Sequence, residues 1–199
     1  NAGLRAASGR YVAYLDSDHV WLPRKLEEQL GVLQAFPRSR WSYTACDRID
    51  ADGQRLPTAV QPATPVRSGR IFEQLLELEI SVAMPTLVAE RSLIDEAGAF
   101  DEEQPYGEFH DFCLRLSMRS EAAAIPRVLC SVRAHDEHYS ADRAAAYLAW
   151  MRLYEKFYGL APTTTERNRC ARMRARAALN LAALQGANRD FSGVWRRLC

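Results

Sequence analysis

A short apolar segment that ends in two aspartates constrains this chain more than any other feature. Residues 11–15 read Tyr-Val-Ala-Tyr-Leu and run directly into Asp16, Ser17 and Asp18. This pattern is typical of a buried strand in an α/β sheet whose end carries an acidic loop. Leucines spaced by four, four and three residues follow within residues 22–33, and they predict an amphipathic helix that Pro37 ends. The chain therefore opens with a strand, an acidic loop and a helix.

Further patterns continue this alternation. Strands are expected at residues 41–45, 86–89 and 124–133, and helices at residues 71–78, 91–97 and 110–119. Pro126 lies inside the last of these strands and favours an edge position for it, because proline cannot donate to a sheet ladder. The sequence predicts an α/β fold with a mostly parallel sheet flanked by helices.

The last quarter of the chain has a different composition. Residues 1–149 carry 16 Lys and Arg against 22 Asp and Glu, whereas residues 150–199 carry 10 against 3. Residues 141–158 and 166–185 are rich in Ala, Leu and Arg at helical spacing, which predicts a helical hairpin. Three interpretations of this basic hairpin stay open: packing on the preceding domain, a homodimer interface, and contact with anionic lipid.

Composition excludes several classes of protein. No apolar run approaches the roughly 20 residues that span a bilayer. The five cysteines form no C-x-x-C pair, which fits free thiols better than a disulfide framework or structural zinc. A pI of about 7.8 and the absence of a known binding module argue against a nucleic-acid partner. These features predict a cytoplasmic protein, with the inner face of the cell membrane as a second location if the basic hairpin binds lipid.

Asp16 and Asp18 are the candidate metal ligands. Two carboxylates separated by one small residue at a strand end offer hard oxygen ligands to Mg²⁺ or Mn²⁺ and leave positions for phosphate oxygens. The alternative is that acids are common in loops after strands and that an isolated D-x-D pattern arises often by chance. His19 follows; an imidazole can also ligate Mn²⁺, but we expect this side chain to face solvent.

Nine short motifs occur in a specific order along the chain. They are NAGL at 1–4, ASGRYVAYLDSD at 7–18, WLP at 21–23, KLE at 25–27, YT at 43–44, DADG at 50–53, GAFDE at 98–102, EFHDFCLRL at 108–116 and RAH at 133–135. Each motif is weak alone, but together they make the chain similar to a family 2 glycosyltransferase with a GT-A fold. The resemblance implies a GT-A domain over residues 1–140 and a helical appendage over 141–199. It also implies that the first strands of the domain, which bind the nucleotide, would precede Asn1. The isolated chain would then hold the half of the domain that binds the metal and the acceptor, and we expect it to be inactive alone.

The resemblance implies an inverting transfer of a sugar from a nucleotide-diphosphate donor to a hydroxyl of a saccharide or lipid-linked acceptor. Asp16 and Asp18 would hold Mn²⁺ or Mg²⁺ on the donor diphosphate, with Asp18 the more direct ligand. A cation there stabilises the charge that develops on the leaving nucleotide. Arg133 and His135 match a place at which the family approaches the phosphates or the metal, although a surface loop explains them equally well.

The second acidic cluster departs from the family pattern. The family commonly has Glu-Asp-x-Asp before an apolar stretch and Arg-Leu, and the first Asp is its usual general base; this chain has Phe109 there. Deprotonating a hydroxyl needs a carboxylate within hydrogen-bond reach, so either Glu108 or Asp111 serves, or the reaction runs differently, or the protein is impaired; Glu108 is our first choice as the base. The alternative is that Glu108 is only an acid in the first turn of a helix, stabilised by the helix dipole.

Two other functions stay open at this point. Phe109 cannot act as a general base, which is compatible with a non-catalytic interaction module that retains the GT-A fold. A nucleotidyltransferase would use the same metal and diphosphate groups and release pyrophosphate. Stabilisation by a nucleotide sugar that depends on the metal ion separates the enzyme from the interaction module.

Overall fold

The structure, a computed structural model, describes residues 1–56, 65–134 and 142–187. The chain divides into two compact units: residues 1–100 with 112–137, and residues 101–111 with 138–199. The elements of the first unit are α1 (Ala2–Ala6), β1 (Tyr11–Ala13), β2 (Val20–Trp21), α2 (Lys25–Ala35), β3 (Ser39–Ile49), α3 (Phe72–Leu76), the 3₁₀ helix η2 (Met84–Thr86), β4 (Val88–Glu90), α4 (Arg91–Ala97) and β5 (Glu121–Arg133). The second unit contains α6 (Arg143–Leu160) and α7 (Thr164–Ala187), and α5 (Glu108–Ser117) has residues in both.

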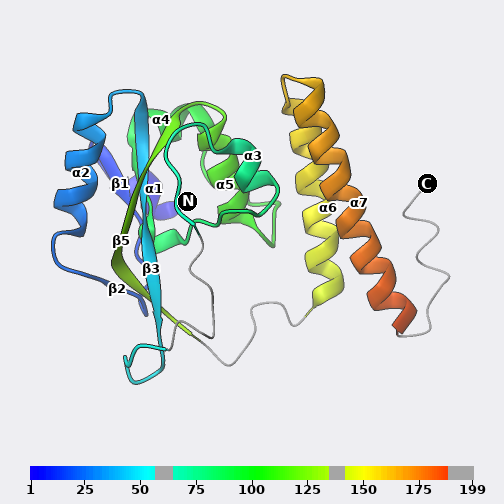
Figure 1. Cartoon of the computed structure of the whole chain (residues 1–199), viewed down its shortest axis with the longest axis horizontal. Coiled ribbons are helices and arrows are strands. Elements are labelled where there is room, and N and C mark those ends of the chain that lie inside the picture. The colour runs from blue at the N-terminus through cyan, green and yellow to red at the C-terminus, as the bar shows by residue number, and fades with distance from the viewer. Residues whose placement is uncertain (57–64, 135–141, 188–199) are drawn as a thin grey trace. The chain divides into compact units, whose positions relative to one another are not determined.

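One sheet organises the first unit (Figure 1). Its strand order is β1, β4, β3, β5, β2. Strands β3 and β5 are parallel, whereas the pairs β1 with β4, β4 with β3, and β5 with β2 are antiparallel. The expected α/β class is confirmed, but the sheet is mixed rather than mostly parallel. Strand direction follows from the path of the connecting segments, which the residue pattern of a strand does not encode.

Strand β5 lies inside the sheet, so the edge position expected from Pro126 is wrong. Two features accommodate the proline. The register of β5 against β3 jumps from Ile125 opposite Thr44 to Val128 opposite Ala45, which leaves Pro126 in an irregularity of the ladder. On the other side, β2 pairs only with Cys130 and Ser131. The missing N–H of the proline therefore falls where β5 makes no regular ladder contact.

The core of the first unit surrounds β3. Trp41 and Tyr43 are fully buried and stack with ring centroids 5.8 Å apart. The Tyr43 hydroxyl donates to the carbonyl of Arg67 at 2.9 Å and accepts from the Arg67 amide at 2.8 Å. Helix α2 packs against β3 and β5, and its Leu33 joins Val88 in the apolar cluster. Helices α2 and α3 lie on opposite sides of the sheet (Figure 1).

The buried face of α2 is more polar than its leucines predict. Leu33 is buried as expected, but Leu26 is 40% exposed, whereas Lys25 and Gln29 are 2% and 0% exposed. The Lys25 ammonium donates to Gln29 Oε1 at 2.6 Å, and it lies 4.5 Å from the centre of the Trp21 ring. The Gln29 amide in turn donates to the carbonyls of Ser42 at 3.2 Å and Thr86 at 2.9 Å. A hydrogen-bonded polar network thus joins α2 to β3 and η2, which makes the burial of these groups tolerable.

Burial lowers the pKa of Lys25 from 10.5 to about 8. Between these values the unfolded chain binds a proton that the folded chain does not, so stability should rise with pH. We expect the free energy of unfolding to increase by up to about 3 kcal/mol between pH 7.5 and 10.5, relative to Lys25→Met. Urea unfolding at a series of pH values measures this. Arg24→Met, which removes a neighbouring exposed cation, should keep the wild-type slope; equal slopes for wild type and Lys25→Met would contradict the prediction.

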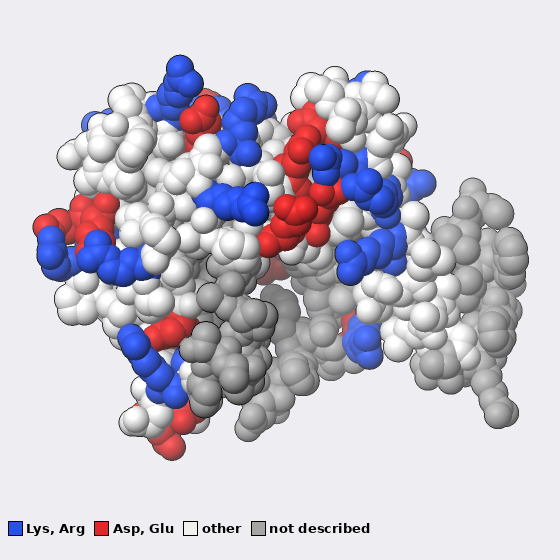
Figure 2. All heavy atoms as spheres, in the orientation of Figure 1, with Lys and Arg blue, Asp and Glu red and all other residues white. Residues whose placement is uncertain are grey.

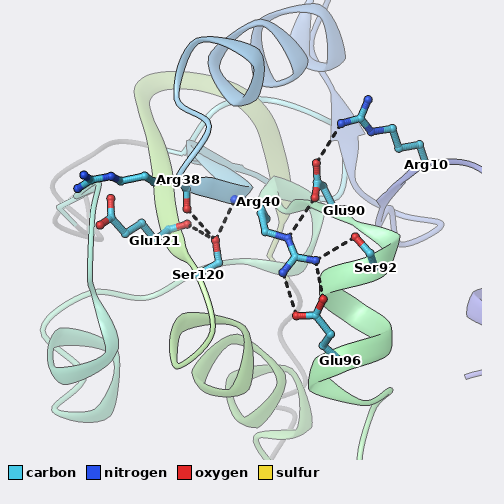
Figure 3. Close-up of polar contacts among 8 residues, drawn as sticks. All are labelled: Arg10, Arg38, Arg40, Glu90, Ser92, Glu96, Ser120 and Glu121. Carbon is cyan, nitrogen blue, oxygen red and sulfur yellow. Dashed lines mark hydrogen bonds and ion pairs between the residues drawn. The ribbon is translucent and has the colours of Figure 1, made fainter.

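Arg40 on β3 ties the sheet to α4 (Figure 3). Its Nε atom lies 3.2 Å from Glu90 Oε2, and its Nη1 and Nη2 atoms donate to Glu96 at 2.8 and 2.9 Å. Nη2 also donates to Ser92 Oγ at 2.9 Å, and the Arg40 amide donates to Ser120 Oγ at 2.9 Å. Such a forked guanidinium contact fixes orientation more than a single charge pair does. None of the residues drawn in Figure 3 is a candidate site residue.

The second unit confirms the expected helical hairpin. Helices α6 and α7 pack together, and a buried stripe on α7 runs from Cys170 through Met173 and Ala177 to Leu181. Glu155 of α6 pairs with Arg174 of α7. Figure 2 shows basic side chains on the visible face of the second unit, interspersed with uncharged and acidic ones. No helix within the described ranges combines the length and hydrophobicity needed to span a bilayer.

Candidate functional site

The two predicted metal ligands lie in the tight loop between β1 and β2. The loop closes with a hydrogen bond from the His19 amide to the Asp16 carbonyl at 3.3 Å. This turn brings Asp16, Asp18 and His19 together within four residues. The side chains of Asp16 and Asp18 are 41% and 31% exposed, so both carboxylates remain accessible to a ligand.

His19 lies between the two carboxylates. Its Nε2 atom is 3.6 Å from Asp16 Oδ2, and its Nδ1 atom is 3.3 Å from Asp18 Oδ2. The Arg133 amide on β5 also donates to His19 Nδ1, at 3.4 Å. Only 14% of the His19 side chain is exposed, so the expectation that it faces solvent is wrong. The reason is the turn, which folds the imidazole back against the end of β5 instead of outward.

Arg133 braces this loop through backbone carbonyls. Its Nε atom donates to the Asp18 carbonyl at 3.0 Å, and its Nη1 atom donates to the carbonyls of Asp50 and Ala51 at 2.5 and 2.7 Å. Asp50 caps the turn after β3, because its Oδ1 atom accepts from the amides of Asp52 and Gln54 at 3.0 and 2.8 Å. One guanidinium therefore joins the acidic loop to the turn that follows β3.

The donor set of this loop is compatible with a divalent cation. Carboxylate oxygens suit Mg²⁺ and Mn²⁺, and an imidazole suits Mn²⁺ as well as softer metals. Within the described residues, however, no group of three or more His, Cys, Asp or Glu side chains was found that could hold a metal ion. Asp16 and Asp18 thus fit a cation that takes further ligands from a bound diphosphate, and they do not form a closed protein site.

The candidate bases lie in the first turn of α5, in the second unit. Glu108 is partly exposed, as is Phe109, which takes the family's usual base position. The Asp111 side chain is 1% exposed, and its Oδ1 atom lies 2.8 Å from the Lys156 ammonium of α6. A buried carboxylate held by a lysine is badly placed to take a proton from a substrate. Among the two candidates, the geometry favours Glu108.

The structure brings Asp16, Asp18 and Arg133 together and places Glu108 and Asp111 on one helix turn. His135 lies outside the described residues. Lys156 is a functional candidate that the sequence patterns missed. The sequence held one signal that could have identified it: Lys25 and Lys156 are the only lysines among 26 basic residues.

A cavity of about 270 Å³ between α6 and α7 is lined by Tyr154, Glu155, Tyr158, Cys170, Ala171 and Arg174, and it includes no candidate site residue.

Comparison with known proteins gives three relevant similarities. A protein of Rickettsia bellii named an uncharacterized glycosyltransferase is 33% identical over 135 residues, which are 67% of this chain and 18% of that protein. The amylovoran biosynthesis glycosyltransferase AmsE of Erwinia amylovora is 26% identical over 153 residues, 74% of this chain and 54% of AmsE. The crystal structure of TarS from S. aureus superposes with a TM-score of 0.57 at 16% identity, over 92% of this chain and 30% of TarS. That last likeness shows the fold alone.

The chain spans only about a fifth of the length of the Rickettsia relative. The family model of glycosyl transferase family 2 matches residues 1–86, a range that includes β1, the acidic loop and β3. The α/β fold of GT-A type that the motifs imply is confirmed by the likeness to TarS. The resemblance inferred from the ordered motifs is thereby confirmed: residues 1–86 match the model of glycosyl transferase family 2, and a relative named a glycosyltransferase aligns over 67% of the chain.

Proposed function

We propose that the protein containing this chain transfers a sugar from a nucleoside-diphosphate sugar to an acceptor hydroxyl, with inversion at the anomeric carbon and dependence on a divalent cation. The observation that carries the proposal is the acidic loop. It lies inside the range matched by the family model, and its two carboxylates flank one imidazole while remaining open to a ligand.

On the donor side, Asp16 and Asp18 are the proposed ligands of Mn²⁺ or Mg²⁺. A cation bound there would neutralise the negative charge that grows on the departing diphosphate. His19 lies within 3.6 Å of both carboxylates. Arg133 was expected to contact phosphates, but three contacts of its guanidinium go to backbone carbonyls. Its proposed role is therefore to hold the shape of the loop.

On the acceptor side, Glu108 is the proposed general base. It would accept the proton of the acceptor hydroxyl as the hydroxyl oxygen forms its bond to the anomeric carbon. The bond from that carbon to the diphosphate oxygen breaks on the opposite face, which inverts the configuration. A positioned base of this kind typically contributes a factor of about 10²–10⁴ to the rate. Asp111 is the weaker candidate because it is buried against Lys156.

The acceptor is proposed to be a saccharide or a lipid-linked saccharide of an envelope polysaccharide. AmsE, a relative by sequence, carries amylovoran biosynthesis in its name. A lipid-linked acceptor would bring the enzyme to the cytoplasmic face of a membrane, where the arginines of α7 are suited to anionic headgroups. Dimerisation through the same helices is the other arrangement that the basic hairpin allows.

Thermal unfolding with metal and donor tests the proposal. The full-length protein should gain several degrees in melting temperature when Mn²⁺ is combined with one of UDP-, GDP- or dTDP-sugars, and less with either component alone. Binding that needs both components reflects a cation shared between protein and diphosphate. Release of a nucleoside diphosphate confirms transfer, whereas release of pyrophosphate would indicate a nucleotidyltransferase. No shift with any donor would favour the non-catalytic interaction module.

A further inference from the structure

Residues 101–111 form a segment that leads into α5 and ends one turn inside it. This segment and the helical hairpin belong to the same compact unit, although 40 or more residues of sequence separate the partners in their contacts. Lys156 of α6 contacts both ends of the segment. Its ammonium lies 2.8 Å from Asp101 Oδ2 and 2.8 Å from Asp111 Oδ1. A single cation thus ties the start of the segment to the first turn of α5.

Other contacts hold the middle of the segment against α6. The Gln104 side chain is buried, and its amide donates to the Tyr106 carbonyl at 2.7 Å and to the Ala149 carbonyl of α6 at 3.0 Å. The His110 ring lies 5.1 Å from the Trp150 ring, centre to centre. Gly107 has a φ of +75°, and a Cβ atom there would approach Trp150 to 3.4 Å. The segment is therefore packed closely along one stretch of α6.

Glu108 lies in the first turn of α5, the turn whose His110 and Asp111 contact α6. Gly107 precedes it, and the Asp111 amide donates to the Gly107 carbonyl at 2.8 Å, which closes the turn around Glu108. Residues three apart on a helix share a face, so the position of Asp111 fixes the position of the Glu108 Cβ atom one turn earlier. The Asp111 carboxylate is almost fully buried, and a buried charge keeps its position only while an opposite charge stays beside it.

We propose that Lys156 is a positioning residue for Glu108. By holding Asp101 and Asp111, it makes the helical hairpin the support on which the proposed general base is oriented. This inference rests on the proposed function for its catalytic consequence. Its structural part, that Lys156 orders residues 101–111, holds independently of what the protein catalyses. Displacing a catalytic group by about 1 Å can lower a rate by about a hundredfold.

The test uses Lys156→Met and Lys156→Arg in the full-length protein, with Arg152→Met as control. Arg152 is an exposed cation on the same helix and no part of the contacts above. Two readouts are needed: amide hydrogen exchange of residues 101–111 and of the loop at residues 16–19, and kcat with KM for donor and acceptor. Asp101→Asn provides a second variant, because that side chain is 33% exposed and its change leaves the pair of Lys156 with Asp111 intact.

We expect Lys156→Met to speed exchange in residues 101–111 at least tenfold without changing residues 16–19, and to lower kcat by tenfold to a hundredfold with donor KM within twofold. Lys156→Arg should restore most of both, and Asp101→Asn should show the same pattern more weakly. Unchanged exchange and kcat in folded Lys156→Met would overturn the proposal. If Lys156→Met does not fold, unchanged values in Asp101→Asn would do so. If the wild type transfers no sugar but Lys156→Met still speeds exchange in residues 101–111, the proposed function is removed. The structural part, that Lys156 orders these residues, then remains.

Discussion

Replacing Asp18 with Asn is expected to lower sugar transfer by about a hundredfold or more, the largest effect of any single change at the acidic loop. Asn keeps the size of the side chain and removes the charge that a divalent cation prefers. A hundredfold loss corresponds to about 2.7 kcal/mol of transition-state stabilisation. It should appear mainly as lost affinity for Mn²⁺ in the presence of donor, measured by titration calorimetry together with initial rates.

Stability distinguishes a ligand from a packing residue in this case. The Asp18 side chain is 31% exposed, so its replacement should change the free energy of unfolding by less than about 1 kcal/mol. Asp52→Asn is a matched control, because Asp52 is an exposed acid in the turn after β3. Unchanged affinity for Mn²⁺ and donor in Asp18→Asn would remove Asp18 from the metal site.

Glu108→Gln is the second change with a large expected effect. Losing a general base should lower kcat by about 10²–10⁴ while metal-dependent donor binding stays as in the wild type. The reason is that Gln keeps the hydrogen-bonding shape but cannot accept the acceptor's proton. Single-turnover rates across a range of pH, together with donor binding by calorimetry, measure the two quantities separately.

Asp111→Asn separates the two candidate bases. Asp111 is buried against Lys156, so this change should mainly destabilise the protein, because it removes the buried one of the two carboxylates that lie 2.8 Å from the lysine. Glu103→Gln, which alters an exposed acid of the same segment, should leave turnover unchanged. If Asp111→Asn abolishes turnover in a folded protein while Glu108→Gln stays active, the roles assigned here are reversed.

Local sequence patterns predicted the individual elements well. The strand at residues 11–15 appears as β1, and the helix expected at residues 91–97 has those bounds and ends at Gly98, whose φ is +83°. These elements are encoded by neighbouring residues: apolar runs, helical spacing and a glycine stop. The same holds for the acidic loop, since the spacing of Asp16 and Asp18 after a strand is itself a local signal.

Features that depend on distant contacts could not be read from those patterns. Pro126 indicated an edge strand, but β5 lies between β3 and β2, and an irregular register beside β3 accommodates the proline. Lys25 reads as a surface residue, but Gln29 and the Trp21 ring make its burial tolerable. Lys156 and Asp101 are 55 residues apart, so no local pattern links them. The contacts that determine these features join residues that are distant in the sequence. For Lys25, they also bury a charged residue that a simple hydrophobic pattern assigns to the surface.

The position of the bound cation decides whether Asp16 and Asp18 are its ligands. Crystals of the full-length protein grown with Mn²⁺ and a nucleoside diphosphate, measured at the manganese absorption edge, would reveal its position through anomalous scattering. We expect a manganese peak about 2.1 Å from an Asp18 carboxylate oxygen and from diphosphate oxygens. A bound nucleoside diphosphate whose manganese lies away from Asp16 and Asp18, with both carboxylates still turned to His19, would contradict this expectation.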